Sequence, residues 1–383
     1  MTTYSLIQAP VTGRRFWRET MKTKLIASLL CVALICCLLA GCGGTAPAAN
    51  TSTETANATP AEKVDDTVYE FTVATRAAEG DLVAASVEWF ATEIESRTNG
   101  RIKLDIQHNG VLCSQGTEFD ALESGICDIA VASLSSNIDR WPSLGWVIVP
   151  GMFSTYTQQS ACLKAVQEAG YIDADIEAND VQVLWWQPAE CFNFALTKTK
   201  VESLSDLKGL KIGYAGGSDI ANVLNTIGAT AVGTNPADFY MSLSTGVIDG
   251  FVNPARYMYD AQFYEVVSYM PVGIACGASN NSVYMSNSAF NSLPDDLKEI
   301  FKEVCAEAGE HFLNNAANLY SNEYELLTEA GCECYDLSED VISEYTSVCA
   351  ELSNGWVSAQ EAAGNSNASA IRDLVLETAA SVG

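Results

Sequence analysis

The chain has 383 residues, of which 48% are hydrophobic and 18% are charged, and its formal net charge at pH 7 is −28. This length and composition are typical of a folded protein with room for two domains, and they argue against a disordered chain. The strong negative charge excludes nucleic acids and bare anionic lipid surfaces as natural partners.

The N-terminal region has the three parts of an export signal. Two lysines precede an apolar run from Leu25 to Leu39, and the run ends in the lipobox Leu-Ala-Gly-Cys42. This run is shorter than the roughly 20 residues that span a bilayer, which favours a signal peptide at 1–41 over a transmembrane anchor. Met21 is a second candidate for the start of translation. We therefore expect an exported, extracytoplasmic protein that is anchored to the cell membrane by a lipid on Cys42.

Small and polar residues fill the stretch 42–66, which predicts a flexible tether. Beyond it, alternating and helical apolar patterns follow each other along the chain. The expected elements are, in order, a strand at 68–75, a helix at 81–96, strands at 102–106 and 128–133 around a helix at 118–124, a helix at 156–169 and a strand at 181–185.

The stretch from Leu204 to Val267 carries the most informative pattern. A short helical turn ends at Gly209, and a strand at 210–214, a helix, a short strand, a second helix and a strand through Val252 follow it. Strands and helices that alternate in this way, with glycines between them, predict an α/β lobe with ligand contacts at the strand ends.

Two segments are expected to connect this lobe to the first one, and helices are expected to close the chain. The complete prediction is an α/β, two-lobed, periplasmic-binding-protein-like fold, with mixed sheets, helices on the faces and a hinge of crossing strands. Lobe I is expected at 67–189 plus about 278–318, and lobe II with the closing helices at 190–277 plus about 319–383.

Four motifs resemble, in order and spacing, the solute-binding subunits of TRAP transporters, the DctP family. They are Asp-Leu-Lys-Gly-Leu-Lys-Ile from Asp206, Thr-Gly-Val-Ile-Asp-Gly from Thr245, Asn253-Pro254, and Phe-Tyr-Glu-Val from Phe263. The resemblance extends over nearly the whole chain from about Val68. It implies an extracytoplasmic receptor that captures a small organic molecule between two lobes and passes it to the small and large membrane subunits of a TRAP permease.

The resemblance also implies an arginine that this sequence lacks. In the family, an arginine in the strand after the Asp-Leu-Lys-Gly turn usually binds the carboxylate of an organic acid. Gly213 stands at that place here, and Cys191 or Phe192 replaces a second arginine in the crossing strand. Removing one partner of a buried Arg–carboxylate pair costs ~2 to 5 kcal/mol, so a simple dicarboxylate should bind weakly.

Three explanations for the missing arginine stay open. In the first, an arginine at another position binds the carboxylate, and Arg256 and then Arg76 are the best candidates. In the second, backbone N–H groups at 213–217 bind an anion. In the third, the ligand lacks a carboxylate. In the third case glycine vacates volume, and aromatic residues could line an apolar pocket, although most of them are expected in the core. These aromatic residues are Trp185, Trp186, Phe192, Phe194, Phe239 and Tyr240.

Asn253 is the expected ligand contact with the most support, because it matches a ligand-binding asparagine of the family and follows a strand end. The alternative is an ordinary turn asparagine beside Pro254. Ser133 and Ser135, at the end of the 128–133 strand, are weaker candidates of the same kind.

Neither a metal nor another cofactor is expected. His108 and His311 share no ligand spacing, and no acid, base or nucleophile motif predicts an enzyme. Most of the cysteines are expected to be small buried residues, although Cys332 or Cys334 could pair with Cys349 or Cys305. A ligand-sensing receptor for a membrane kinase would share all of these features and is the alternative function.

Overall fold

The computed structural model describes residues 66–215 and 218–382. The predicted signal peptide, Cys42 and all but the last residue of the predicted tether lie outside these ranges. Within them, no helix combines the length and the apolar character needed to cross a bilayer.

One mixed sheet of ten strands organises the described residues, in the order β2-β1-β3-β9-β4-β7-β5-β6, with β8 between β4 and β10. Its strands are β1 (Tyr69–Ala74), β2 (Ile102–Gln107), β3 (Ile129–Ser133), β4 (Val181–Leu196), β5 (Lys211–Tyr214), β6 (Thr230–Gly233), β7 (Gly250–Asn253), β8 (Tyr269–Val272), β9 (Ala275–Ser286) and β10 (Glu333–Asp336). The strand order confirms the predicted α/β class with mixed pairing.

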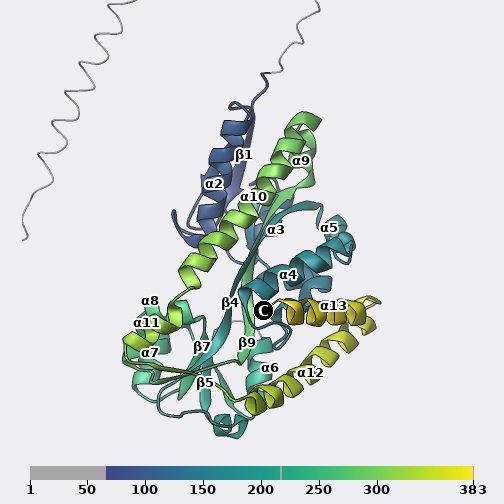
Figure 1. Cartoon of the computed structure of the whole chain (residues 1–383). Helices are drawn as coiled ribbons and strands as arrows, with labels where there is room; N and C mark the ends of the chain where they lie inside the picture. Colours follow the sequence, from purple (N-terminus) through teal and green to yellow (C-terminus); the bar gives the residue numbers. More distant parts are fainter. Residues whose placement is uncertain (1–65, 216–217, 383) are drawn as a thin grey trace, which may run out of the picture. The chain divides into compact units, whose positions relative to one another are not determined.

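Two long antiparallel strands, β4 and β9, form the predicted crossing (Figure 1). At one end they join β1, β2 and β3, and at the other end β4 joins β7, which pairs with β5. The register between β4 and β9 shifts on both sides of Cys191. Irregular pairing of this kind bends a strand, and here it separates the two halves of the sheet, which we call the first and the second lobe.

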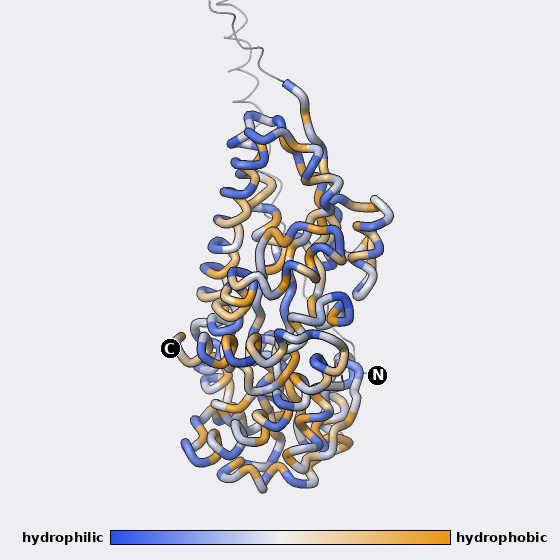
Figure 2. The backbone as a smooth tube through the Cα atoms, turned by 90° about the vertical axis from the view of Figure 1, so that its right-hand side faces the viewer, coloured by the Kyte–Doolittle hydropathy of each residue, from blue (hydrophilic) through white to orange (hydrophobic). Residues whose placement is uncertain are grey.

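Helices cover both faces of the sheet, and Figure 2 shows hydrophobic and hydrophilic positions alternating along their turns. The α-helices are α2 (Leu82–Arg97), α3 (Glu118–Glu123), α4 (Tyr156–Glu168), α5 (Asp173–Asn179), α6 (Ser218–Thr226), α7 (Phe239–Ser244), α8 (Ala255–Asp260), α9 (Asn287–Ser292), α10 (Asp295–Tyr320), α11 (Glu323–Glu329), α12 (Glu339–Ala362) and α13 (Ala368–Ser381). Five short 3₁₀ helices are η1 (Ser135–Arg140), η2 (Pro142–Ile148), η3 (Leu204–Leu207), η4 (Pro236–Asp238) and η5 (Phe263–Glu265).

Helix α2 shows how the sequence pattern produces the packing. Its residues Val87, Phe90 and Ile94 recur at helical spacing and are buried against the sheet. The Phe90 ring lies 5.1 Å from Phe301 of α10, so α2 and α10 cover the same face of the first lobe. The helix ends where Asn99, next to Gly100, adopts a positive φ of 51°.

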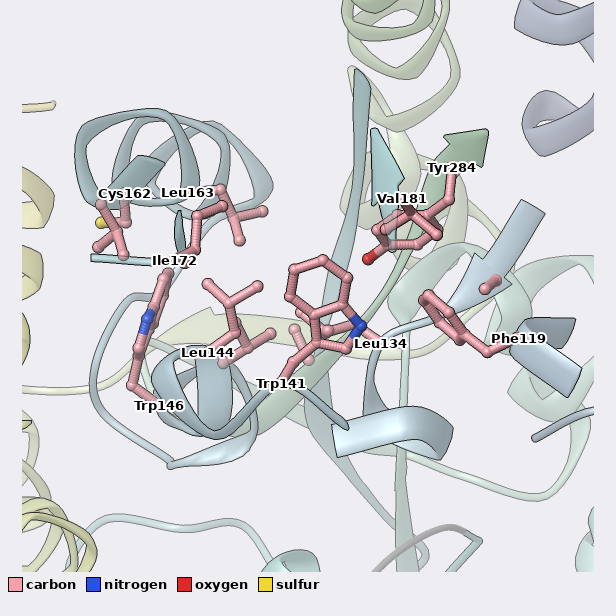
Figure 3. Close-up of a cluster of buried hydrophobic side chains, with 14 of the residues drawn as sticks. Phe119, Leu134, Trp141, Leu144, Trp146, Cys162, Leu163, Ile172, Val181 and Tyr284 are labelled. Carbon is pink, nitrogen blue, oxygen red and sulfur yellow. The ribbon is translucent and has the colours of Figure 1, made fainter. Parts of the chain in front are cut away.

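The other face of the first lobe is packed with aromatic rings from separate elements (Figure 3). Trp141 lies 5.9 Å from Phe119 and 5.2 Å from Tyr284, measured between ring centroids. Each such side chain contributes ~1.5 to 3 kcal/mol by leaving water. This core fixes the loop after β3, and that loop carries several of the predicted site residues.

Helix α13, one of the expected closing helices, packs on the first lobe. Its residues Ile371 and Val375 join the core of the first lobe, and the Cys162 thiol of α4 donates a hydrogen bond of 3.4 Å to the Val375 carbonyl. Helix α12, by contrast, begins on the second lobe through Val341 and Tyr345. Long-range docking of this kind leaves no local signal in the sequence.

The nine cysteines of the described ranges are free thiols, and all except Cys334 are buried. They agree with the expectation of small buried residues rather than with pairing of Cys332 or Cys334 to Cys349 or Cys305. Within the same ranges, no group of three or more His, Cys, Asp and Glu side chains is arranged to hold a metal ion.

Candidate functional site

Arg76, directly after β1, is held by acidic and amide partners. Its Nε lies 3.2 Å from Oε1 of Glu118, and its Nη1 donates to Oε1 of Gln115 at 3.2 Å. The Glu118 side chain is fully buried, and its Oε2 accepts hydrogen bonds from the Gly116 N–H at 2.7 Å and from the Asn137 amide at 3.2 Å. The positive charge of Arg76 is therefore compensated by a carboxylate of the protein itself.

The structure brings Ser133 and Ser135 into the same network as Arg76. The hydroxyls of the two serines lie 3.1 Å apart, and the Ser136 hydroxyl lies 3.4 Å from that of Ser133. The Gln115 amide donates to the Ser136 hydroxyl at 2.5 Å, which links the serines to the partner of Arg76. Three residues that the sequence predicted separately thus form one polar cluster at the ends of β1 and β3.

A small cavity of about 210 Å³ opens beside this cluster. Thr75, Arg76 and Asn281 supply its polar wall, and Val83 and Val131 part of its apolar wall. Asn281 pairs in register with Ser133 of β3 on one side and with Gln187 of β4 on the other, so a polar row crosses three strands. The cavity is thus polar on one side and apolar on the other. No sequence motif marks Asn281, so this residue was not among the predicted contacts.

In the second lobe, Asn253 ends β7 opposite Asn193 of β4. Asn253 is half-buried, whereas Asn193 is buried and donates a hydrogen bond of 3.1 Å from its amide to the Cys191 carbonyl. The predicted contact Asn253 therefore lies at a strand end and next to the crossing strand, as its motif implied.

Arg256 lies beyond Asn253, at the start of α8, and its guanidinium has protein partners. Its Nε donates to Asp260 at 3.0 Å, and its Nη1 donates to the Leu319 carbonyl at 3.5 Å. It also faces the carboxyl groups of Glu190 and Glu323. Arg256 thus joins β4, α8 and α11, and it is not an unpaired cation.

Glu190 and Glu323 form a buried carboxyl pair beside Arg256. Each residue is 6% exposed, and the two carboxyl groups lie close enough to affect each other's pKa. Burial and then the Glu323 carboxyl raise the pKa of Glu190 to about 10, and burial also raises the pKa of Glu323. The pair therefore holds one proton at neutral pH. The rings of Tyr156 and Tyr320 pack beside it, 5.3 Å apart.

The expectation that glycine at position 213 leaves open volume beside it is wrong. A Cβ on Gly213 would lie 2.7 Å from Cδ1 of Ile248 and 3.0 Å from Cε1 of Phe239. Phe239 itself is fully buried, with its ring 5.0 Å from that of Phe251 in the core of the second lobe. The volume beside the glycine is thus filled by the ring that was expected to face a ligand.

The two aromatic candidates of β4 also pack onto the protein. The Trp186 indole donates a hydrogen bond of 2.7 Å to Gln167 of α4, and Phe192 packs against the core of the second lobe. Both side chains are half-buried. The structure therefore does not bring Trp186, Phe192 and Phe239 together around one cavity.

A larger groove, of about 570 Å³, lies where α12 passes from the second lobe to the first. It is walled by the loop region 138–150, by Asn222 of α6 and by one face of α12. The sequence does not predict this groove, because its three walls are more than 70 residues apart and carry no motif. Its lining residues are Ile138, Asp139, Pro142, Gly145, Ile148, Val149, Pro150, Asn222, Glu351, Leu352, Gly355, Trp356, Ala359 and Gln360.

Comparison with known proteins gives a consistent result. A profile of the DctP family, described as bacterial extracellular solute-binding protein, family 7, matches residues 73–357. A solute-binding protein of Albidiferax ferrireducens is 25% identical over 283 residues, which cover 70% of this chain and 80% of the relative.

Two solved TRAP periplasmic solute-binding proteins have a similar fold. One, from Desulfovibrio salexigens, superposes with a TM-score of 0.74 at 20% identity and covers 82% of this chain and 96% of its own. The other, from a Sulfitobacter species and solved with bound β-D-galacturonate, gives a TM-score of 0.65 at 20% identity, with 80% and 99% covered.

Proposed function

The chain belongs to the DctP family of bacterial extracellular solute-binding proteins, and from this membership we propose that it captures a small organic solute between its two lobes for a TRAP-type transporter. The observation that carries the proposal is the placement of two polar sites on either side of the crossing strands. One contains Arg76, Ser133 and Asn281 in the first lobe, and the other contains Asn253 in the second.

The geometry of β4 supports closure of the lobes around a ligand. This strand continues from one lobe to the other, and its pairing with β9 is irregular around Cys191. A hinge of a few strand residues is a common device for closing two lobes over a ligand. When the lobes close, contacts from each lobe surround the ligand in one buried site. The affinity for the ligand then depends on the contacts of both lobes.

We assign direct ligand contacts to Asn253, Arg76, Ser133 and Ser135. Arg256, with partners on Asp260, Leu319 and the Glu190–Glu323 pair, is assigned a positioning role at the hinge. Gly213, Trp186, Phe192 and Phe239 are assigned to packing of the lobes, because their neighbours are protein atoms.

We further propose that simple dicarboxylates bind weakly. The charge of Arg76 is compensated by Glu118, and position 213 carries no arginine and no room for one. A carboxylate ligand would therefore meet a guanidinium that already has an anionic partner. β-D-Galacturonate, bound in the Sulfitobacter structure, is a natural reference acid for this comparison.

Export and anchoring complete the proposal. The signal peptide at 1–41 and a lipid on Cys42 would keep the protein on the outer side of the cell membrane, with the small and large permease subunits as partners. A ligand-sensing receptor for a membrane kinase is the alternative. Neighbouring genes for two membrane subunits favour transport, and a neighbouring sensor-kinase gene favours sensing.

The test is a thermal-shift screen of the purified chain against organic acids, including galacturonate, and against neutral, cationic and aromatic compounds of similar size. A ligand that binds the folded state alone raises the melting temperature. At least one compound should stabilise the protein and be recovered unchanged. If no compound of any class stabilises the protein, solute binding is overturned. If a bound compound is converted to a product, the protein is an enzyme after all.

A further inference from the structure

The groove between 138–150 and α12 has the dimensions of a ligand site and lies at the junction of the lobes. Its volume of about 570 Å³ falls within the range of small-molecule sites. Asn222 belongs to the second lobe and Ile138 to the first, and Leu352 packs against the cores of both. A molecule in this groove would contact both lobes.

One helix face forms a long wall of this groove. Leu352, Trp356 and Gln360 are spaced by four residues, so they point from successive turns of α12 in the same direction. The Trp356 indole N–H and the Gln360 carbonyl are buried, and neither has a hydrogen-bond partner among the described residues. Such unpaired polar atoms cost about 1 to 3 kcal/mol each.

Two glycines shape the groove. A Cβ on Gly145 would lie 2.6 Å from Nε1 of Trp356, so glycine at this position allows the indole to seat against the loop. Gly355, on α12, has the opposite surroundings: no atom lies within 4 Å of the position of its Cβ. The helix therefore leaves open space beside the indole.

The charges of the groove differ from those of an acid-binding site. Asp139 and Glu351 are among its lining residues, and no lysine, arginine or histidine is. The rest of the lining is mainly apolar. Carboxylates in a partly apolar groove repel an anionic ligand and attract a cationic one.

We propose that this groove binds the apolar body of the ligand, and that the ligand is an amphipathic organic molecule without net negative charge. The proposal rests on the proposed function and names the ligand class of the receptor. The groove shares no lining residue with the Arg76 cavity; Ser135 of η1 belongs to the polar cluster at Arg76, and Ile138 of the same 3₁₀ helix lines the groove.

The test uses three probes with the same phenyl body and different charge: phenethylamine, 2-phenylethanol and phenylacetate. Isothermal titration of the full chain should show binding of the amine and the alcohol, with phenylacetate weaker by at least about tenfold. Gly355→Leu fills the open space and should weaken the amine and the alcohol by at least about tenfold. Ser358→Leu, which places the same side chain on an exposed position of α12, should bind as the wild type does.

The outcomes separate this inference from the proposed function. Three results would overturn the groove assignment and leave solute binding intact. Phenylacetate could be the tightest probe, or the two leucine variants could bind equally well. The third result is that no phenyl probe binds while another compound of the thermal-shift screen does. Only a complete absence of ligands in that wider screen contradicts both. Equal melting temperatures of the unliganded variants would show that a loss of affinity is not a loss of fold.

Discussion

The carboxyl groups of Glu190 in β4 and Glu323 in α11 lie next to each other inside the protein, beside the guanidinium of Arg256. Two neighbouring buried carboxylates cannot both be charged without strong repulsion, so the pair retains one proton. The pair connects the crossing strand to the helix that follows α10, and its protonation is therefore coupled to the stability of the fold.

The first prediction concerns pH. The unfolded Glu190 side chain loses its proton near about pH 4.3, whereas in the folded protein its pKa is about 10. The folded state therefore binds more protons between these values. The stability contributed by this group is complete below the lower value and is lost as pH rises toward the higher one.

In urea unfolding at pH 5, 7 and 9, the wild type should therefore lose more stability with rising pH than Glu190→Gln, by up to ~1.4 kcal/mol per pH unit. Glu325→Gln, an exposed neighbour in α11, should follow the wild type. Parallel curves for wild type and Glu190→Gln would contradict the shared proton.

The second prediction concerns Gly213. Because Ile248 and Phe239 fill the space beside it, Gly213→Ala should reduce the free energy of unfolding by ~1 to 3 kcal/mol. Gly233→Ala is the matched control in the adjacent strand β6, since its Cβ would meet no atom nearer than 3.7 Å. Chemical denaturation of both variants measures the difference, and equal stabilities would show that the second-lobe core has room after all.

The third prediction concerns the seat of Trp356. Gly145→Ala should displace the indole and cost ~1 to 3 kcal/mol, because its Cβ would lie 2.6 Å from Nε1. Gly355→Ala should instead stabilise α12 by ~0.5 to 1 kcal/mol, since alanine favours the helix and meets no neighbour. Opposite changes in melting temperature are the expected result, and changes of the same sign would argue against this geometry.

The fourth prediction concerns Arg76 and Glu118. Arg76→Ala leaves Oε1 of the buried Glu118 without its ion-pair partner and should cost about 1 to 3 kcal/mol. Glu118→Gln in the Arg76→Ala background should recover part of this loss, because the neutral amide is less costly to bury. A double-mutant cycle from urea unfolding measures the coupling, and additive effects would mean that the ion pair contributes nothing.

The fifth prediction concerns ligand contacts. Asn253→Ala should weaken binding of the compound found in the thermal-shift screen by more than Ser135→Ala does, because Asn253 stands at the strand end beside the hinge. Titration of both variants with that compound gives the comparison. Equal affinities would remove Asn253 as the principal contact.

The sequence by itself determined the α/β class, the order of many of the elements and the crossing strands. Local periodicity reports which residues are buried and which backbone geometry they adopt, so helix α2 and strand β5 after Gly209 could be predicted from their own residues. The motifs around Asp206 and Asn253 added the family, and the absence of an arginine at Gly213 was visible directly.

The tertiary structure alone decided what surrounds these residues. Phe239 fills the space at Gly213, Arg256 joins a carboxyl pair, α13 docks on α4, and α12 builds a groove with the loop after β3. Each of these contacts joins segments that lie far apart in the sequence. Side-chain direction and long-range docking depend on how all elements pack at once, and a local pattern carries no record of that packing.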